Sequence, residues 1–216
     1  MRVAIVGTDT GVGKTFITAA LTGALQNRNC DVRAVKPVQT GFPPDDDAAV
    51  IASVCNAKSA ICLRYLEAPL APAVAAEREE IDLSYETLCQ ETAAALDETA
   101  ISIVEGIGGL RVPLADNREV VDLVADLECT AVVVARSGLG TLNHTALTLE
   151  ALSQRGVPVL AVVLNEYAGA TTAERTNPDV LRSMTDAPIL TMPTVDRADL
   201  VATASEQLAP IIEQLE

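Results

Sequence analysis

The sequence predicts an α/β protein with three layers, in which helices cover both faces of a doubly wound, mostly parallel sheet. Short apolar runs rich in β-branched residues recur along the chain, and segments with helical spacing separate most of them. Near-continuous apolar strands that alternate with amphipathic helices are typical of such a sheet. Apolar residues make up 49% of the chain and aromatic residues only 2%, so we expect a core of alanine, valine, leucine and isoleucine.

We expect one domain over residues 1–216, because a chain of this length can bury about 70% of its extended surface in a single core. No stretch has the composition of a linker, and no internal repeat divides the chain. The predicted strands cover residues 2–7, 31–36, 101–104, 131–135, 158–164 and 188–192.

Helices are predicted where apolar residues recur every three or four positions. The clearest patterns run over residues 16–25 and 142–152. The last segment, residues 200–215, is predicted to be one closing helix in spite of Pro210. One of the three aspartates at 45–47 is expected to cap a helix that begins just after them.

The first predicted strand leads directly into the sequence GTDTGVGKT, residues 7–15. In a glycine-rich turn between a strand and a helix, backbone N–H groups can converge on an anion at the positive end of the helix. Lys14 can then reach the terminal phosphates of a nucleotide, and Thr15 can offer a hydroxyl group to magnesium. The spacing departs from the common form, because Thr8 holds the usual glycine position. The pattern predicts an ATP-binding loop of the P-loop NTPase type, and the alternative is a glycine turn with a chance lysine.

Two further charged residues stand where predicted strands end, and parallel sheets bind ligands at that side. Lys36 ends the second strand, and a second cation near the γ-phosphate can stabilise charge that develops during phosphoryl transfer. Glu105 follows the strand at 101–104, where it can hold magnesium directly or through water. The alternatives are a surface lysine with its ammonium group in water and a carboxylate that is only solvated.

Two polar residues have roles that the local pattern leaves open. Asn165 follows the predicted strand at 158–164, and its amide can read the hydrogen-bonding edge of adenine or cap a turn. His144, the only histidine, stands in the first turn of a predicted helix. No metal ligands cluster around it in the sequence, and we expect it to make a structural hydrogen bond.

The chain is strongly acidic, with a formal net charge of −15. This charge repels nucleic acids and anionic membranes, so neither is expected as a partner. The acidic surface, with few lysines, suits a salt-rich cytoplasm in which ions screen self-repulsion. The five cysteines form no C-x-x-C pair and are expected to be buried thiols in a reducing compartment. With no leader sequence and no apolar run of membrane-spanning length, a cytoplasmic protein is expected.

Taken together, the motifs resemble those of the dethiobiotin synthetase family. They are GTDTGVGKT, KPVQTG, EGIGGLRVPL and GLGTLNH, followed by the asparagine after the penultimate strand. They cover most of the chain in the family's order, and Leu70-Ala71-Pro72 is similar to its proline-containing loop on the substrate side. The resemblance implies an ATP-dependent cyclo-ligase that forms the ureido ring of dethiobiotin from 7,8-diaminononanoate and CO2, with release of ADP and phosphate. In the family one amine is carbamylated, ATP phosphorylates the carbamate, and the second amine displaces phosphate.

The resemblance also implies roles for individual residues. Lys14 and Lys36 would be catalytic and would neutralise the γ-phosphate and the carbamate. Mg2+ would be held by Thr15, Asp47 and Glu105, and Asp47 is favoured among the three aspartates because it lies immediately before the helix. The nucleotide-binding residues would be Gly11, Val12, Gly13, Lys14, Thr15, Phe16, Asp47, Glu105, Gly106, Ile107, Gly108, Asn165, Glu166, Pro193, Thr194 and Val195. The substrate-binding residues would be Thr40, Gly140, Thr141, Leu142 and Asn143.

The family is dimeric, and residues 140–143 resemble the helix start that receives the substrate's carboxylate from the partner subunit. Free N–H groups and the helix dipole favour an anion there. Three positions depart from the family pattern. Thr40 stands where many relatives have serine, Gly11 where certain relatives carry glutamate, and Thr191 where a glycine is expected.

Two other classes of P-loop protein fit parts of the pattern. Partitioning or cell-division ATPases resemble this chain in fold but carry an additional lysine early in the phosphate loop, and residues 1–13 contain none. Their membrane-associated members tend to end in a basic amphipathic helix, whereas the end here is acidic. ATP-dependent amidases of the cobyrinate type phosphorylate a carboxylate and usually need a glutaminase domain, for which this chain is expected to be too short.

Overall fold

In the computed structural model, which describes residues 1–56 and 58–216, seven strands form one sheet in the order β3-β2-β4-β1-β7-β8-β9. Each pair of neighbouring strands in this sheet is parallel. The strands are β1 (Arg2–Gly7), β2 (Val32–Thr40), β3 (Ala60–Leu66), β4 (Ile101–Gly109), β7 (Thr130–Arg136), β8 (Val159–Asn165) and β9 (Ile189–Met192). A separate antiparallel hairpin consists of β5 (Pro113–Ala115) and β6 (Arg118–Glu119).

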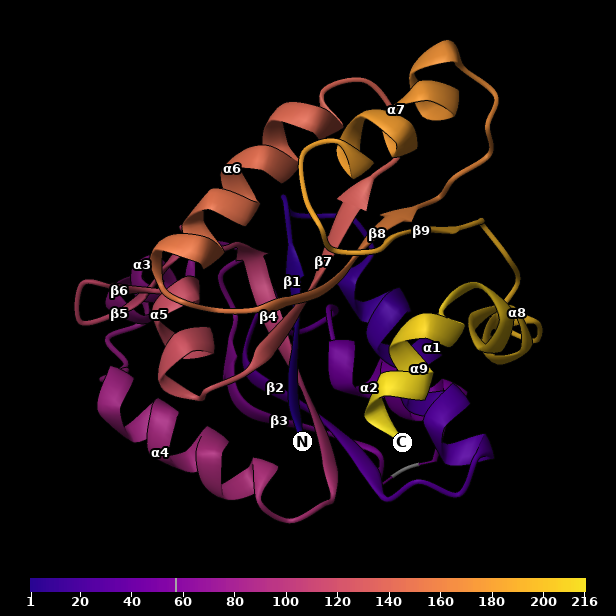
Figure 1. Ribbon diagram of the computed structural model, residues 1–216. Helices are drawn as coiled ribbons and strands as arrows, with labels where there is room; N and C mark the ends of the chain where they lie inside the picture. Colours follow the sequence, from indigo (N-terminus) through magenta and orange to yellow (C-terminus); the bar gives the residue numbers. More distant parts are fainter. Residues whose placement is uncertain (57) are drawn as a thin grey trace.

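Helices cover both faces of the sheet (Figure 1), as the sequence predicts. One face packs against α1 (Lys14–Asn27), α2 (Asp47–Val54), α8 (Leu200–Gln207) and α9 (Ala209–Leu215). The other packs against α3 (Pro72–Arg78), α4 (Tyr85–Leu96), α5 (Val120–Asp126), α6 (Thr141–Gln154) and α7 (Thr172–Arg182). Successive residues of β1 serve the two faces in turn, because side chains alternate along a strand. Val3 and Ile5 pack with α1, while Ala4 and Val6 face the opposite layer.

The strands β2 and β4 extend beyond their predicted ends, so two predicted site residues lie within strands rather than at their ends. Lys36 lies inside β2, which continues to Thr40 because its neighbour β3 pairs with it that far. Glu105 lies inside β4, which continues to Gly109 and pairs there with Gly7 of β1. The expectation that both charged residues stand at or after the end of a strand is therefore wrong. Lys36 pairs with Cys62 of β3, and Glu105 pairs with Ile5 of β1, so the backbone of each residue is fixed by the sheet.

The sequence-based assignment also missed one strand and joined two helices. Residues 60–66 form β3, an edge strand whose central residues are only half-buried, so its sequence lacks the continuous apolar run of the inner strands. The closing segment is two helices, because Leu208 leaves the helical conformation and Pro210 begins a new first turn. The predicted cap before α2 is Asp46, whose side chain accepts a hydrogen bond from the Ala49 N–H at 2.9 Å.

The cysteines and the helix lengths test the expectations about buried thiols and membrane-spanning segments. All five cysteines, each within the described ranges, are free thiols. Only Cys129 is fully buried, and the other four are half-buried, so the expectation of buried thiols holds for one position. In residues 1–56 and 58–216, no helix is both long and apolar enough to cross a membrane.

Candidate nucleotide-binding site

The loop between β1 and α1 has the geometry of an anion site. Gly13 precedes the first helical residue with φ of 94°, and no side chain caps the helix there. The first N–H groups of α1 therefore remain available to an anion at the positive end of the helix. A Cβ atom on Gly13 would lie 2.0 Å from the Asn165 amide nitrogen, so a larger residue would displace the Asn165 side chain and would be strained at this φ. Gly11 also takes a left-handed conformation, with φ of 73°.

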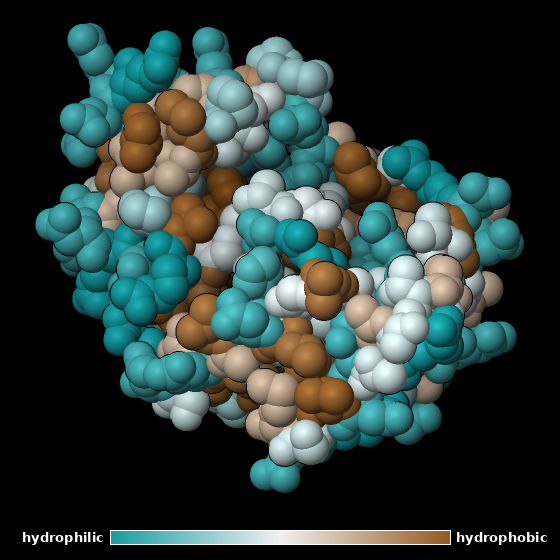
Figure 2. Space-filling model, turned by 90° about the horizontal axis from the view of Figure 1, so that it is seen from above, coloured by the Kyte–Doolittle hydropathy of each residue, from teal (hydrophilic) through white to brown (hydrophobic). Residues whose placement is uncertain are grey.

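Beside this loop lies a cavity of about 690 Å³ at the carboxyl ends of the strands. Figure 2 looks down on this end of the molecule, where apolar residues gather toward the middle and polar residues form much of the rim. An apolar wall is contributed by Leu70 and Ala71, which precede α3, and by Pro72, its first residue. The predicted site residues that line the cavity are Gly11, Gly13, Lys14, Thr15, Lys36, Thr40, Asp47, Glu105, Ile107 and Gly108.

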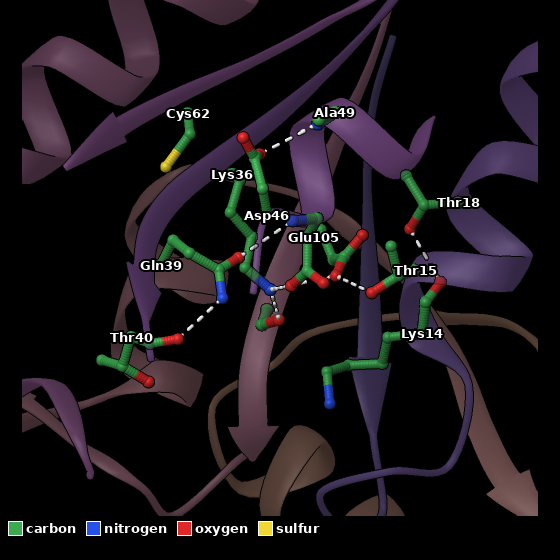
Figure 3. Close-up of polar contacts among 12 residues, drawn as sticks. Lys14, Thr15, Thr18, Lys36, Gln39, Thr40, Asp46, Ala49, Cys62 and Glu105 are labelled. Carbon is green, nitrogen blue, oxygen red and sulfur yellow. Dashed lines mark hydrogen bonds and ion pairs between the residues drawn. The ribbon is translucent and has the colours of Figure 1, made fainter. Parts of the chain in front are cut away.

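The ammonium group of Lys36 lies at the centre of a buried polar cluster (Figure 3). It is 2.6 Å from Asp47 Oδ2 and 2.9 Å from Glu105 Oε1, and it donates to the Gly106 carbonyl at 3.1 Å. Thr15 donates its hydroxyl hydrogen to the same Glu105 oxygen at 2.8 Å. Side chains from α1 and β2 thus converge on one carboxylate, which β4 carries.

The two lysines reach the cavity from opposite sides of Glu105, as Figure 3 shows. Burial, and secondarily the charge of Lys36, lowers the pKa of Lys14 to about 8. Burial also acts to lower the pKa of Lys36, but Glu105 and Asp47 outweigh it and the net shift is upward. Burial would raise the pKa of Asp47, but the ion pair with Lys36 outweighs it and lowers that pKa. The site therefore holds Lys36 firmly charged, while the Lys14 ammonium group loses its proton more readily than an exposed lysine would.

The predicted magnesium ligands meet in the same cluster. Glu105 Oε2 is buried and makes no hydrogen bond to any described residue, although the other oxygen of this carboxylate accepts two. A buried carboxylate oxygen without a partner is costly, and a hard cation would satisfy it. Thr15 and Asp47 offer two more oxygen atoms to the cavity. The donor set fits Mg2+, which prefers a few carboxylate or hydroxyl ligands and completes its shell with water and phosphate.

Asn165 contacts the phosphate loop from the end of β8. Its amide nitrogen donates to the Val12 carbonyl at 3.0 Å, while its buried Oδ1 has no partner among residues 1–56 and 58–216. Met192 pairs with Asn165 in the sheet, so the loop at 193–195 starts beside it. Glu166 follows Asn165 with φ of 54°, and its carbonyl accepts a hydrogen bond from Ser137. These residues, with Val12, Phe16 and Gly106, lie outside the lining of the main cavity.

The predicted carboxylate-binding segment also lies outside this cavity. Gly140 precedes α6 with φ of 93°, and no side chain among the described residues caps the helix. The Thr141 N–H donates to the Gly138 carbonyl at 3.3 Å, which leaves the N–H groups of Leu142 and Asn143 available. The neighbouring Leu139 is 90% exposed. His144 lines a smaller cavity between α6 and the phosphate loop, and its buried Nδ1 makes no hydrogen bond within the described chain. The structural hydrogen bond expected of His144 is therefore not made through Nδ1.

Sequence reasoning missed several residues that shape the main cavity. Thr10 lines it from within the phosphate loop, whose motif marks only the glycines and the final Lys-Thr pair as functional. Gln39 lines it from β2, and it stands in the KPVQTG motif that was quoted only for its lysine and threonine. Arg136 forms an ion pair with Asp9 of the loop at 2.6 Å, a contact between residues too distant in sequence for a local pattern to reveal.

The parallel sheet, the uncapped glycine loop and the buried lysine beside it define a P-loop nucleotide-binding protein. Solved structures agree with this class. The septum site-determining protein MinD from Pyrococcus horikoshii, complexed with Mg-ADP, matches with a TM-score of 0.63 and 17% identity, over 100% of this chain and 95% of that one. A ParA family ATPase from Chlorobium tepidum matches with a TM-score of 0.62 and 14% identity, over 97% and 91% of the two chains. At these identities the likeness shows the fold alone.

Proteins with similar sequences show to which family of P-loop nucleotide-binding proteins the chain belongs. A family model described as an AAA domain matches residues 1–199. An ATP-dependent dethiobiotin synthetase from Haloferax mediterranei is 54% identical over 95% of this chain and 90% of its own length. Others from Mycobacteroides abscessus and Aquifex aeolicus are 38% and 35% identical, over 98% and 93% of this chain and 91% and 92% of their own lengths. The chain belongs to the dethiobiotin synthetase family, which confirms the resemblance predicted from the motifs.

Proposed function

We propose that residues 1–216 form one catalytic domain in which the two buried lysines activate a CO2 adduct of a diamine. The chain is an ATP-dependent dethiobiotin synthetase, a ligase of biotin biosynthesis. It joins 7,8-diaminononanoate and CO2 into a ureido ring and converts ATP to ADP and phosphate. The observation that carries the residue assignment is the convergence of Lys14, Lys36 and Glu105 on one cavity beside an open helix start.

In the proposed sequence, one substrate amine attacks CO2 and loses a proton to give a carbamate. A carbamate oxygen then attacks the γ-phosphorus of ATP, and ADP leaves. The second amine attacks the carbamoyl carbon, phosphate leaves with the C–O electron pair, and loss of a proton completes the ring. Lys36 neutralises the carbamate and Lys14 the γ-phosphate, because fixed cations in a water-poor cavity stabilise charge that develops on these oxygens.

Thr15, Asp47 and Glu105 are the proposed ligands of Mg2+. When bound, the ion would supply positive charge to the phosphate oxygens. The unpartnered Glu105 Oε2 supports this assignment. The phosphate loop, from Gly11 to Phe16, would hold the phosphates through its N–H groups, and Gly106, Ile107 and Gly108 would close the site from β4.

Asn165 is the proposed reader of the adenine base. Its Oδ1 can accept a hydrogen bond from an adenine amino group while its nitrogen stays bound to the Val12 carbonyl. Glu166, Pro193, Thr194 and Val195 would complete the base pocket. Thr40 would contact the diamine with its hydroxyl group.

We also propose a homodimer, in which residues 140–143 of one subunit bind the carboxylate end of the substrate held by the other. The open start of α6 and the exposed Leu139 beside it support this arrangement. Sedimentation equilibrium should give twice the mass of the chain. A strictly monomeric, active enzyme would refute the proposal.

The proposed setting is a cytoplasm of high salt. The charge of −15 favours expansion of the chain in dilute buffer, and ions screen this repulsion. The free energy of unfolding should therefore rise as KCl increases to molar concentration. Full stability in dilute buffer would contradict salt adaptation.

The central test is a product assay in molar KCl with ATP, magnesium and bicarbonate, with the diamine present or omitted. Mass spectrometry should detect dethiobiotin only when the diamine is present, with one ADP per product. ATP hydrolysis that is indifferent to the diamine would instead favour a switch ATPase.

A further inference from the structure

Gln39 makes two hydrogen bonds that tie together the ends of the loop at 41–46. Its amide nitrogen donates to the Thr40 carbonyl at 2.8 Å, and its Oε1 accepts the backbone N–H of Asp47 at 3.2 Å. The side chain lies between Thr40 and the start of α2 in Figure 3 and is 5% exposed. Both polar atoms of the Gln39 side chain thus form hydrogen bonds with backbone groups, although the residue lines the cavity.

The hydrogen bond from the Asp47 N–H to Gln39 caps α2 with a side chain from β2. The first N–H groups of a helix have no partner within the helix. The Asp46 side chain satisfies the Ala49 N–H, and Gln39 satisfies the Asp47 N–H. The position of the Asp47 backbone is therefore set by β2, the strand that also carries Lys36.

The ammonium group of Lys36 already uses its full donor capacity. It has three N–H bonds, and its three acceptors are Asp47, Glu105 and the Gly106 carbonyl. To donate to an anionic substrate, Lys36 must give up one of them. The Asp47 side chain is 26% exposed whereas the Glu105 side chain is 0% exposed, so water can replace Lys36 at Asp47 with the smaller penalty.

We propose that Gln39 is a positioning residue, which anchors the backbone of Asp47 so that only its carboxylate moves when Lys36 turns to an anionic substrate. The inference rests on the proposed roles of Lys36 and Asp47. Without the anchor, release of the ion pair would also free the first turn of α2. The carboxylate would then be lost from the nucleotide end of the cavity.

The test compares Gln39→Met, which keeps the length but removes both polar ends, with Gln26→Met. Gln26 is a half-buried glutamine on α1 outside the cavity, and its amide binds Ser59. In nucleotide-free protein, amide hydrogen exchange in the first turn of α2 should be about fivefold faster in Gln39→Met, the factor expected for a lost helix cap. Gln39→Glu retains an acceptor oxygen and should restore slow exchange. Gln26→Met should leave α2 unchanged.

Calorimetric titration with MgADP gives the functional half of the test. Gln39→Met should weaken binding about fivefold and lower kcat, while the KM for the diamine stays constant. Unchanged exchange in α2 would refute the anchor. Faster exchange with unchanged MgADP affinity and kcat would show that the bond is structural only and overturn the proposal. Asp47→Asn tests the proposed function separately, because wild-type MgADP affinity in that variant would refute the role of Asp47 whatever Gln39 does.

Discussion

Replacement of Lys36 by methionine separates the structural role of the buried cluster from its chemical role. Methionine has nearly the same length and no charge, so the change removes two ion pairs and a hydrogen bond with little loss of volume. Glu105, whose side chain is 0% exposed, is then left without a cationic partner. Asp47 is less affected, because water reaches it.

The expected loss of stability follows from this burial. Removal of one partner of a buried ion pair costs about 3–5 kcal/mol, and the Thr15 hydrogen bond to Glu105 places this site near the lower end. For a chain of this size, about 3 kcal/mol corresponds to a fall in Tm of about 6–12 °C. Turnover should fall at least about a hundredfold, because a lost contact to developing charge costs about 3 kcal/mol or more.

The assays are thermal unfolding and steady-state dethiobiotin formation, both in molar KCl and with turnover measured well below the Tm of the variant. The matched control is Lys36→Met combined with Glu105→Gln, which removes the unpaired charge and should recover most of the lost stability. Turnover should stay low in the double variant. Near-normal turnover in Lys36→Met would remove Lys36 from the mechanism, and an unchanged Tm would refute the argument from burial.

Three further variants test the phosphate loop. Gly13→Ala should weaken ADP binding more than about tenfold in calorimetry, because its Cβ would lie 2.0 Å from the Asn165 amide nitrogen and φ is 94°. Wild-type affinity would show that the Asn165 side chain moves aside without cost to the site. Asn165→Ala should raise the KM for ATP about tenfold and leave the KM for the diamine unchanged, since it removes the hydrogen bond to Val12 and the proposed hydrogen bond to the base. Equal effects on both KM values would argue against base recognition. In nucleotide-free protein, the pKa of Lys14 is lowered from 10.5 to about 8. Between pH values of about 8 and 10.5 the unfolded state therefore binds more protons than the folded state. The contribution of Lys14 to the free energy of unfolding should thus rise with pH across this range. Chemical denaturation should show this rise in wild type relative to Lys14→Met, and identical pH profiles would refute the shift.

The parts of the fold that sequence predicted are those fixed by local patterns. The strand at 2–7 is buried on both faces, so its sequence is a continuous apolar run. The phosphate loop was readable because its glycines, lysine and threonine are neighbours in the chain. β3 was missed because an edge strand with half-buried residues need not be apolar throughout. The strand ends at Lys36 and Glu105 were misplaced because pairing with neighbouring strands, which is a long-range effect, carries β2 and β4 further.

Local patterns could place the two site lysines at one edge of the sheet, but they could not reveal what those lysines contact. Glu105 is 69 residues from Lys36 in the chain, and only the neighbouring positions of β2 and β4 bring them together. The contact between Lys36 and Glu105 changes how Lys36, the second cation of the site, can meet a substrate. In the free protein its charge is already neutralised by two carboxylates, and its donors are fully used. A substrate anion must therefore compete with Asp47 rather than meet a free ammonium group, so an anion that cannot enter the cavity far enough to displace Asp47 gains nothing from the charge of Lys36.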